Sequence, residues 1–181
     1  YLEFAKAIHQ VRPDVHIHGF SPLEVWHGAT SLDMSISAYL SQLKDVGLRS
    51  LPGTAAEILD DEVRAIICPD KLSTDLWLDI METAHGLGLP TTSTIMFGHV
   101  EASHHIARHL LRLRRLQERT DGFTEFVPLP FVHMEAPISL KSRARRGPTL
   151  REAVLIHAVS RLVLHPHITN IQTSWVKMGP D

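Results

Sequence analysis

Histidine and amide side chains recur in this chain inside short apolar segments. His16 and His18 alternate with apolar residues in VHIHGF, and Asn170 and Gln172 occupy alternate positions in ITNIQT. Successive side chains of a strand point to opposite faces, so each pair is expected on one face of its strand. Val, Ile and Leu would fill an ordinary core. Neutral hydrogen-bonding groups at these positions therefore indicate a wet cavity that binds a polar ligand.

Carboxylates and a further histidine follow other segments of the same kind. Glu57, in PGTAAEIL, is either a helix-start carboxylate that complements the helix dipole or a group that binds ribose hydroxyls or an amino group. His99 and Glu101, in FGHVE, are either ligand contacts or general acid/base groups, with a satisfied loop histidine as the simpler alternative. Glu125 lies in FTEFVP, where the sequence leaves its direction open.

The histidine, amide and carboxylate side chains lie in or after strand-like segments, and helical patterns separate these segments from one another. Strands are predicted at 15–20, 48–52, 91–98, 123–128 and 168–174, and helices at 2–11, 33–46, 74–87, 103–119 and 149–164. Such alternation indicates βαβ units and a parallel sheet, in which the carboxyl ends of the strands build the site. We predict an α/β fold in which residues 1–181 form a single domain, a partial (β/α) TIM-like barrel with five consecutive parallel strands in sequential order.

The helical patterns carry their own start signals and buried faces. The first helix is predicted to bury Leu2, Phe4, Ala5, Ile8 and Val11. Asp33 or Ser35 can cap the second helix, and Thr74 is predicted to cap the third. Thr149, with Glu152 three residues later, predicts a capping box for the last helix.

Composition restricts the function classes. The 181 residues are 44% hydrophobic with a formal net charge of −2, which gives no electrostatic case for nucleic acid. The basic run at 141–146 is either a solvated loop or a phosphate or carboxylate clamp. No stretch approaches the roughly 18 apolar residues of a membrane span, and no signal peptide precedes the first helix. The single cysteine, Cys68, fits a reducing cytoplasm, where we expect the protein.

The histidines leave two function classes open. Paired histidines at a strand end can bind zinc, so His16 and His18 suit a zinc-dependent barrel hydrolase, although matching strand ends offer no clear third and fourth ligand. The alternative is a barrel that binds an organic cofactor and a polar heterocycle through dispersed contacts. His104, His105 and His109 are expected to be mostly exposed on one helix, and their spacing is weak evidence for a metal.

Three stretches of the chain, taken together, resemble a known family. They are SLPGTAAEILDDEVRAIICPDKLSTDLWLDIMETAHGLGLPTTSTIMFGHVE, GFTEFVPLPFVHMEAPI and HPHITNIQTSWVKMGPD. The resemblance is to the radical S-adenosylmethionine family that makes deazaflavin, in its tyrosine-dependent 4-hydroxyphenyl transferase component, and it is greatest to the version fused within FO synthase. Radical S-adenosylmethionine enzymes of the futalosine pathway of menaquinone synthesis share the barrel and some of these blocks, and they remain an alternative.

The resemblance implies a reaction and its cofactors. Reductive cleavage of S-adenosylmethionine at a 4Fe-4S cluster leads to fragmentation of L-tyrosine, whose hydroxybenzyl unit joins 5-amino-6-(D-ribitylamino)uracil. The family holds its cluster by three cysteines spaced C-x3-C-x2-C, which this chain lacks, so the cluster ligands are expected outside it. The chain is then expected to lack the cluster-binding strand and the end of the barrel, to be inactive alone, and to be fused to or work with the second FO synthase component.

The resemblance also implies site residues, without assigning a catalytic one. The positions expected to face the S-adenosylmethionine pocket are Glu57, Thr94, His99 and Glu125, with the backbone near Val127 and Pro128 beside adenine. Glu57 is expected to bond ribose or the methionyl ammonium. A ribitylaminouracil needs several neutral hydrogen-bonding groups, and those expected to line its site are His16, His18, Asn170 and Gln172.

Overall fold

A computed structural model describes residues 1–134, 136–141 and 143–174 of the chain, in which short parallel strands alternate with helices. The elements, in order, are α1 (Leu2–Val11), β1 (Ile17–His18), α2 (Pro22–Ser31), α3 (Ile36–Asp45), β2 (Leu48–Ser50), α4 (Asp61–Ile67), α5 (Thr74–Gly86), β3 (Thr91–Phe97), α6 (Ser103–Thr120), β4 (Phe123–Pro130), α7 (Pro137–Leu140) and α8 (Leu150–Leu164). None of these helices is long and apolar enough to span a bilayer.

The strands form two small parallel sheets that isolated bridges connect. β1 pairs with β2, and β3 pairs with β4 from Thr91 opposite Phe123 to Phe97 opposite Pro130. A parallel bridge joins Leu51 to Thr91, so the end of β2 lies beside β3. The predicted parallel direction and sequential neighbours are therefore confirmed for these four strands.

The fifth predicted strand, 168–174, is reduced to one parallel bridge between Phe126 and Ile171. The Phe126 N–H donates to the Asn170 carbonyl over 2.9 Å, and the Gln172 N–H donates to the Phe126 carbonyl over 3.0 Å. These two bonds place the segment beside β4 in the predicted order. The first strand is also shorter than predicted, because only Ile17 of its helix-facing residues is buried and Val15 is exposed.

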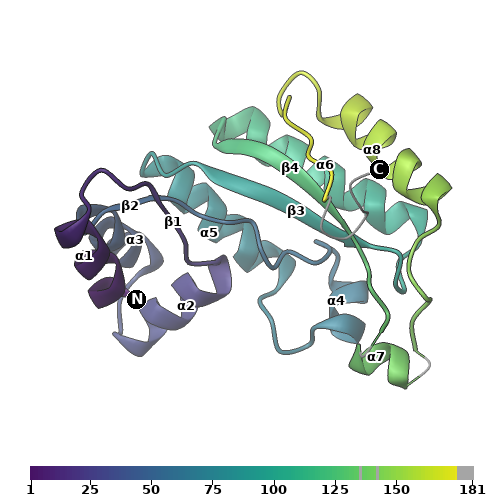
Figure 1. The fold of residues 1–181 in the computed structure, drawn as a ribbon, viewed down its shortest axis with the longest axis horizontal. Helices are drawn as coiled ribbons and strands as arrows, with labels where there is room; N and C mark the ends of the chain where they lie inside the picture. The colour runs from purple at the N-terminus through teal and green to yellow at the C-terminus, as the bar shows by residue number, and fades with distance from the viewer. Residues whose placement is uncertain (135, 142, 175–181) are drawn as a thin grey trace.

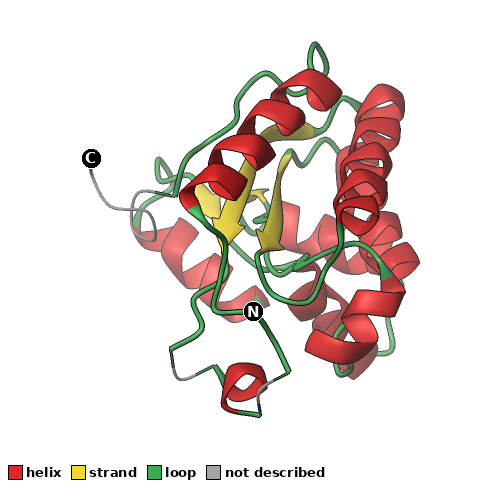
Figure 2. Cartoon of the chain, turned by 90° about the vertical axis from the view of Figure 1, so that its right-hand side faces the viewer, coloured by secondary structure: helices red, strands yellow, loops and turns green. Residues whose placement is uncertain are grey.

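Helices cover the strands through apolar stripes. Figure 1 shows α1, α2 and α3 around β1 and β2 at one end of the molecule, and α6 and α8 along β3 and β4 at the other. Figure 2 shows the strands in the middle, with helices outside them. In α6 the buried stripe is Leu110, Leu113 and Leu116, and α5 buries Trp77, Ile80, Met81 and Ala84 as its periodicity predicts.

Some helix boundaries differ from those predicted. Helix α2 was not predicted, although Ser21 caps it, Pro22 begins it and Glu24 completes a capping box. The helix predicted to begin near residue 33 begins at Ile36, because Asp33 adopts a left-handed turn conformation with φ of 51° and Ser35 caps the helix.

Two further details correct the predicted helix ends and faces. Ser73, rather than Thr74, caps α5, since the Thr74 N–H and hydroxyl both donate to Asp61. The capping box of Thr149 and Glu152 at α8 is confirmed. In α1, however, only Ala5 is buried among the described residues, and the predicted inward residues Phe4, Ile8 and Val11 are exposed.

Candidate functional site

Two exposed histidines, from the start of β1, meet a buried serine at the end of β2. The Nε2 atom of His16 and the Nδ1 atom of His18 each lie 2.7 Å from the Ser50 hydroxyl oxygen. A serine hydroxyl supplies only one hydrogen, so at least one of the two rings must donate to it. The structure therefore brings His16 and His18 onto one face, and it adds Ser50, which no sequence pattern had singled out.

A carboxylate and an amide extend this face onto β4. Burial lowers the pKa of His18, the neighbouring His16 lowers it further, and the Glu125 carboxylate opposes both effects. The Glu125 carboxylate is therefore near enough to His18 to act on its charge. The Gln172 amide donates to the Glu125 carboxylate. We call His16, His18, Ser50, Glu125 and Gln172 the polar face.

Asn170 does not join the polar face through its side chain. Its amide nitrogen donates to the Thr124 carbonyl over 3.2 Å, while its backbone carbonyl accepts from Phe126. The side chain is largely exposed but already engaged with the β4 backbone. In this structure it supports the edge of the sheet beside the polar face.

The loop from β2 to α4 runs beside β3 and presents Glu57. The Gly53 N–H donates to the Thr92 hydroxyl, the Thr94 hydroxyl donates to the Gly53 carbonyl, and the Met96 N–H donates to the Glu57 carbonyl. A Cβ atom on Gly53 would lie 2.4 Å from the Thr92 carbonyl oxygen, so this close approach requires glycine. The loop is thereby fixed along the strand.

Glu57 forms a partly buried ion pair at this strand end. Its Oε1 atom lies 2.7 Å from the Lys71 Nζ atom, and the two side chains are 20% and 28% exposed. Glu57 has φ of 51°, a left-handed conformation that is uncommon for a residue other than glycine. Because α4 begins only at Asp61, the helix-start alternative for Glu57 is wrong. The carboxylate binds an amino group, that of Lys71, which the sequence had not identified.

The other positions expected near the cofactor lie on β3 and β4 with different exposure. Thr94 is buried against Gly53 and stands opposite Val127 in the strand register. Val127 is half-buried, whereas the next residue, Pro128, is buried. Of these positions, Thr94 contacts the loop that carries Glu57, and Val127 and Pro128 lie on the next strand. Their cofactor contacts remain predictions.

His99 and Glu101 form a closed hydrogen-bonded turn after β3. The His99 Nδ1 atom accepts from the Val100 N–H, so Nε2 carries the hydrogen that it donates to the Met96 carbonyl. Glu101 accepts from the N–H groups of Gly98 and His99. Burial lowers the pKa of His99, although Glu101, Met96 and Glu57 oppose the effect. Both side chains are buried and engaged inside the turn, and their predicted ligand or acid/base role remains a prediction.

The basic run is tied to this turn through one arginine. Arg145 contacts Glu152 over 2.6 Å and Glu101 over 3.5 Å, and its N–H donates to the His99 carbonyl. Lys141, Arg143 and Arg146 are exposed or nearly so, and Ser142 lies outside the described residues. The described residues of the run are solvated, and Arg145 alone among them forms ion pairs, with Glu101 and Glu152.

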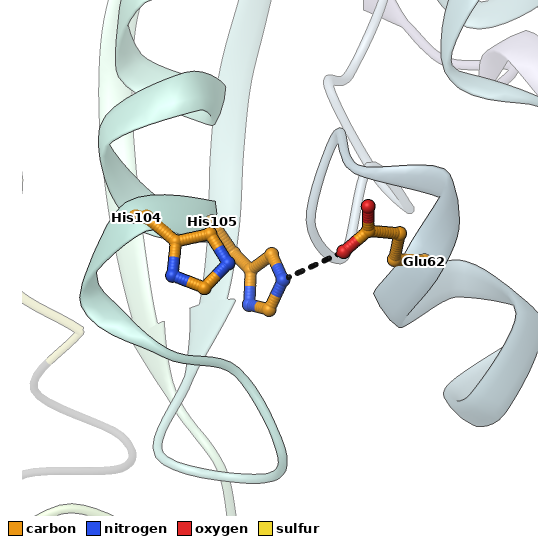
Figure 3. A group of neighbouring side chains, drawn as sticks. All are labelled: Glu62, His104 and His105. Atoms are coloured by element: carbon orange, nitrogen blue, oxygen red, sulfur yellow. Dashed lines mark hydrogen bonds and ion pairs between the residues drawn. The ribbon is translucent and has the colours of Figure 1, made fainter.

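Within the described residues, one group has the donor types of a metal site: Glu62, His104 and His105 (Figure 3). The His105 Nδ1 atom accepts from the Ala102 N–H over 2.9 Å, so the hydrogen lies on Nε2 and points at Glu62, 3.4 Å away. A metal at Nε2 would require the hydrogen on Nδ1 instead. Arg108 also lies 3.8 Å from the Glu62 carboxylate. The geometry is that of a hydrogen-bonded helix start.

Two expectations about histidines change as a result. His109 was expected to be mostly exposed, but it is fully buried because it shares the inward face of α6 with Leu113 and Leu116. His16 and His18 have no third metal ligand of the His, Cys, Asp or Glu type within reach in the part of the chain that the structure describes. Their geometry favours hydrogen bonding over zinc.

Comparison with known proteins gives a consistent set of relatives. No family model matches the chain. It is 52% identical over 181 residues to the FO synthase of Streptomyces coelicolor, covering all of this chain and 21% of that protein. It is 51% identical over 179 residues to the 5-amino-6-(D-ribitylamino)uracil--L-tyrosine 4-hydroxyphenyl transferase of Methanothermobacter thermautotrophicus, covering 99% of this chain and 49% of that protein. An FO synthase of Mycobacterium tuberculosis is 49% identical over 179 residues. The chain thus spans between a fifth and a half of these relatives.

Proposed function

Because this chain is a homologue of the FO synthase family along its whole length, we propose that it is part of a transferase that joins the 4-hydroxybenzyl group of L-tyrosine to 5-amino-6-(D-ribitylamino)uracil. The observation that carries the proposal is the 51% identity over 179 residues to the transferase named for these substrates. The polar face supports it, because a heterocycle with a polyol chain is bound by several hydrogen-bond donors and acceptors, and this face presents them.

The proposed fold is a part of a single (β/α) barrel domain, whose lumen the polar face would line. Parallel neighbours in sequential order from β1 to the segment around Ile171 support this arrangement. In such a barrel the functional groups lie at or near the carboxyl ends of the strands. The loop after β2 that carries Glu57 lies at such an end.

We assign Glu57 to the S-adenosylmethionine site, with Thr94, His99, Val127 and Pro128 in its surroundings. The residues present fit that cofactor in one respect, since the Glu57 carboxylate already binds an ammonium group, that of Lys71. The methionyl ammonium would take the same kind of contact. When bound, the cofactor supplies the radical that takes hydrogen from tyrosine.

The residues of this chain do not fit the 4Fe-4S cluster that the family implies. The chain has one cysteine, which is buried, and burial raises the pKa of its thiol, so it is a poor source of thiolate. Cluster ligands would have to come from outside the 181 residues.

Glu125 is better placed with the substrate than with the cofactor. It couples to His18 and accepts from Gln172, so it belongs to the polar face. We propose that this face, with Asn170 at its edge, binds the ribitylaminouracil. Ser50 holds the two histidine rings in a fixed arrangement there.

The test uses the intact enzyme, purified without oxygen and supplied with S-adenosylmethionine and a reductant. Tyrosine should be consumed only when 5-amino-6-(D-ribitylamino)uracil is present, and metal analysis should find iron with sulfide. Turnover of futalosine derivatives without consumption of tyrosine would instead assign the chain to the menaquinone relatives. Zinc in the absence of iron and sulfide would overturn the radical mechanism.

A further inference from the structure

Arg64 is a buried arginine whose hydrogen-bond partners are backbone carbonyls. It lies in α4, and its side chain is only 4% exposed. Nε donates to the Leu72 carbonyl over 2.8 Å, as does Nη2, and Nη1 donates to the Ala56 and Ile58 carbonyls over 2.5 and 3.2 Å. A buried charge is costly unless it is paired or hydrogen-bonded, and here the carbonyl dipoles perform that role.

The nearest carboxylate to this guanidinium is largely occupied elsewhere. Asp61 Oδ1 lies 3.8 Å from the Arg64 Nε atom, on a side chain that is 60% exposed. The same oxygen accepts from the N–H and hydroxyl groups of Thr74 at the start of α5. An ion pair with Asp61 therefore does not explain why an arginine is buried at this position.

The carbonyls that Arg64 binds flank the charged pair of the site. Ala56 and Ile58 stand on either side of Glu57, and Leu72 follows Lys71 directly. Arg64 and Lys71 also line the same small cavity, of about 100 Å³, with Leu72 and Trp77. One guanidinium thus ties together the two backbone segments from which the Glu57 and Lys71 side chains project.

Glu57 needs such support because of its backbone conformation. A residue other than glycine keeps a left-handed backbone conformation only where surrounding contacts hold it there, and Glu57 has this conformation. The Met96 N–H holds the Glu57 carbonyl on the side of β3. Arg64 holds the carbonyls of the residues immediately before and after Glu57.

We propose that Arg64 is a positioning residue that sets the place of Glu57 and Lys71 for ligand binding, an inference that rests on the function proposed above. A lysine cannot replace it, because an ammonium presents three donors from one point, whereas the planar guanidinium reaches three carbonyls in two segments. Arg64 does not contact the ligand. It acts through the two residues that it holds.

The experiment compares Arg64→Lys, Glu57→Gln and the double variant in the intact enzyme. Amide hydrogen exchange should rise in residues 54–58 and 70–73 of Arg64→Lys, because these segments lose their common anchor. Its affinity for S-adenosylmethionine should fall about tenfold, as expected for the loss of one hydrogen bond to a charged group. KM for the cofactor should rise more than kcat falls.

The double variant separates positioning from general destabilisation. If Arg64 acts through Glu57, the affinity loss in the double variant is smaller than the product of the two single losses. Arg112→Lys is the matched control: Arg112 also donates to a loop carbonyl, that of Leu59, but touches neither flank of Glu57 nor Lys71. It should change neither exchange in the two segments nor cofactor affinity.

The experiment distinguishes failure of the inference about Arg64 from failure of the proposed function. Unchanged exchange in Arg64→Lys would overturn the inference whatever the enzyme catalyses. Suppose that Glu57→Gln lowers the affinity for S-adenosylmethionine. Arg64→Lys with raised exchange and unchanged affinity would then also overturn the inference. If Glu57→Gln itself leaves affinity unchanged, the site assignment fails, and the ligand part of the inference fails with it. Should Arg64→Lys not fold, Arg64→Gln, which buries no charge, provides the same readouts.

Discussion

Glu57 combines an unusual backbone conformation with a carboxylate that already binds a cation. Its side chain is one-fifth exposed, so a ligand can reach it without unfolding the loop, and Lys71 is the group that it must release. The pair is only partly buried, and solvent still reaches both groups, so we expect its contribution to stability to stay near that of a surface ion pair, at most about 1 kcal/mol. Binding and stability should therefore respond differently to its removal.

We expect Glu57→Gln in the intact enzyme to weaken S-adenosylmethionine binding while changing the free energy of unfolding by less than about 1 kcal/mol. Equilibrium binding and denaturant unfolding of the same preparation measure the two quantities. Glu62→Gln is the control, because Glu62 lies on the neighbouring helix and is largely exposed. Unchanged affinity in Glu57→Gln would remove Glu57 from the cofactor site.

His109 is a buried titratable residue that the proposed reaction does not use. Its Nδ1 atom accepts from the Leu59 N–H over 2.9 Å, and burial lowers its pKa to about 3. In the unfolded chain the His109 side chain binds a proton near pH 6.5, whereas in the folded chain it stays neutral at that pH. Acidification therefore favours the unfolded state. This destabilisation of the folded state is absent above pH 6.5 and grows as the pH falls toward the folded-state pKa.

Acidification from pH 7 to pH 5 should therefore cost about 2 kcal/mol through His109 alone. The midpoint of denaturant unfolding, measured across this range, should fall less steeply in His109→Asn, which keeps an acceptor near Nδ1 but does not titrate. His104→Asn, at an exposed position of the same helix, should keep the original slope. An equal slope in His109→Asn would show that the histidine does not control acid sensitivity.

The sequence predicted some residues of the site, whereas the residues that contact them were found only in the structure. Alternation placed His16 and His18 on one face correctly because strand geometry has a period of two. Lys71 and Arg64 lack any such signal: they lie 14 and 7 residues from Glu57 in an insert without periodicity, and only the fold brings them together. Ser50 could not be predicted either, because its strand is too short to show an alternating pattern.

At the scale of elements, the loop between β2 and α4 functions as an extension of the sheet. It follows β3 from the Leu51–Thr91 bridge to the contact between Glu57 and Met96. Gly53 permits the close approach that starts this path. The position of Glu57 therefore depends on a residue without a side chain.

We expect Gly53→Ala to destabilise the intact enzyme by about 1–3 kcal/mol, since the added Cβ forces the loop away from the Thr92 carbonyl. Cofactor affinity should fall with it, because the loop carries Glu57. Gly86→Ala is the matched control: a Cβ there meets nothing within 4 Å, and alanine favours the helix. A wild-type unfolding midpoint in Gly53→Ala would contradict the close contact.

The sequence predicted most elements, and it predicted buried faces best in the long helices. The stripes of α5 and α6 gave their faces correctly because three or more turns average out exceptions. Helix α2 was missed although SPLE carries its capping box, since its ten residues have no clear apolar stripe. Segment 168–174 has strand composition, yet tertiary pairing supports only one bridge.

At the scale of the molecule, helices α3, α5, α6 and α8 pack one against the next in that order, and α8 is the last helix described. Helix α6 contacts α5 on one side and α8 on the other. Helix α8 leaves Leu155, Val159 and Leu162 exposed along one stripe, and with α6 it borders a cavity of about 580 Å³. Contiguous apolar surface of this kind marks a contact surface. In the proposed barrel, the helix of a further βα unit would cover it.

Substitution of a charged residue on this stripe tests the proposed barrel in the intact enzyme. If a further helix covers α8, Leu162→Lys buries an ammonium group and should destabilise the fold by about 2 kcal/mol or more. Leu111→Lys is the matched control, because Leu111 is exposed on α6, whose two neighbouring helices are both present, and it should stay within about 0.5 kcal/mol. Denaturant unfolding of both variants gives the comparison. Equal, near-zero effects would mean that the α8 stripe faces solvent in the whole enzyme, and that the βα series does not continue across it.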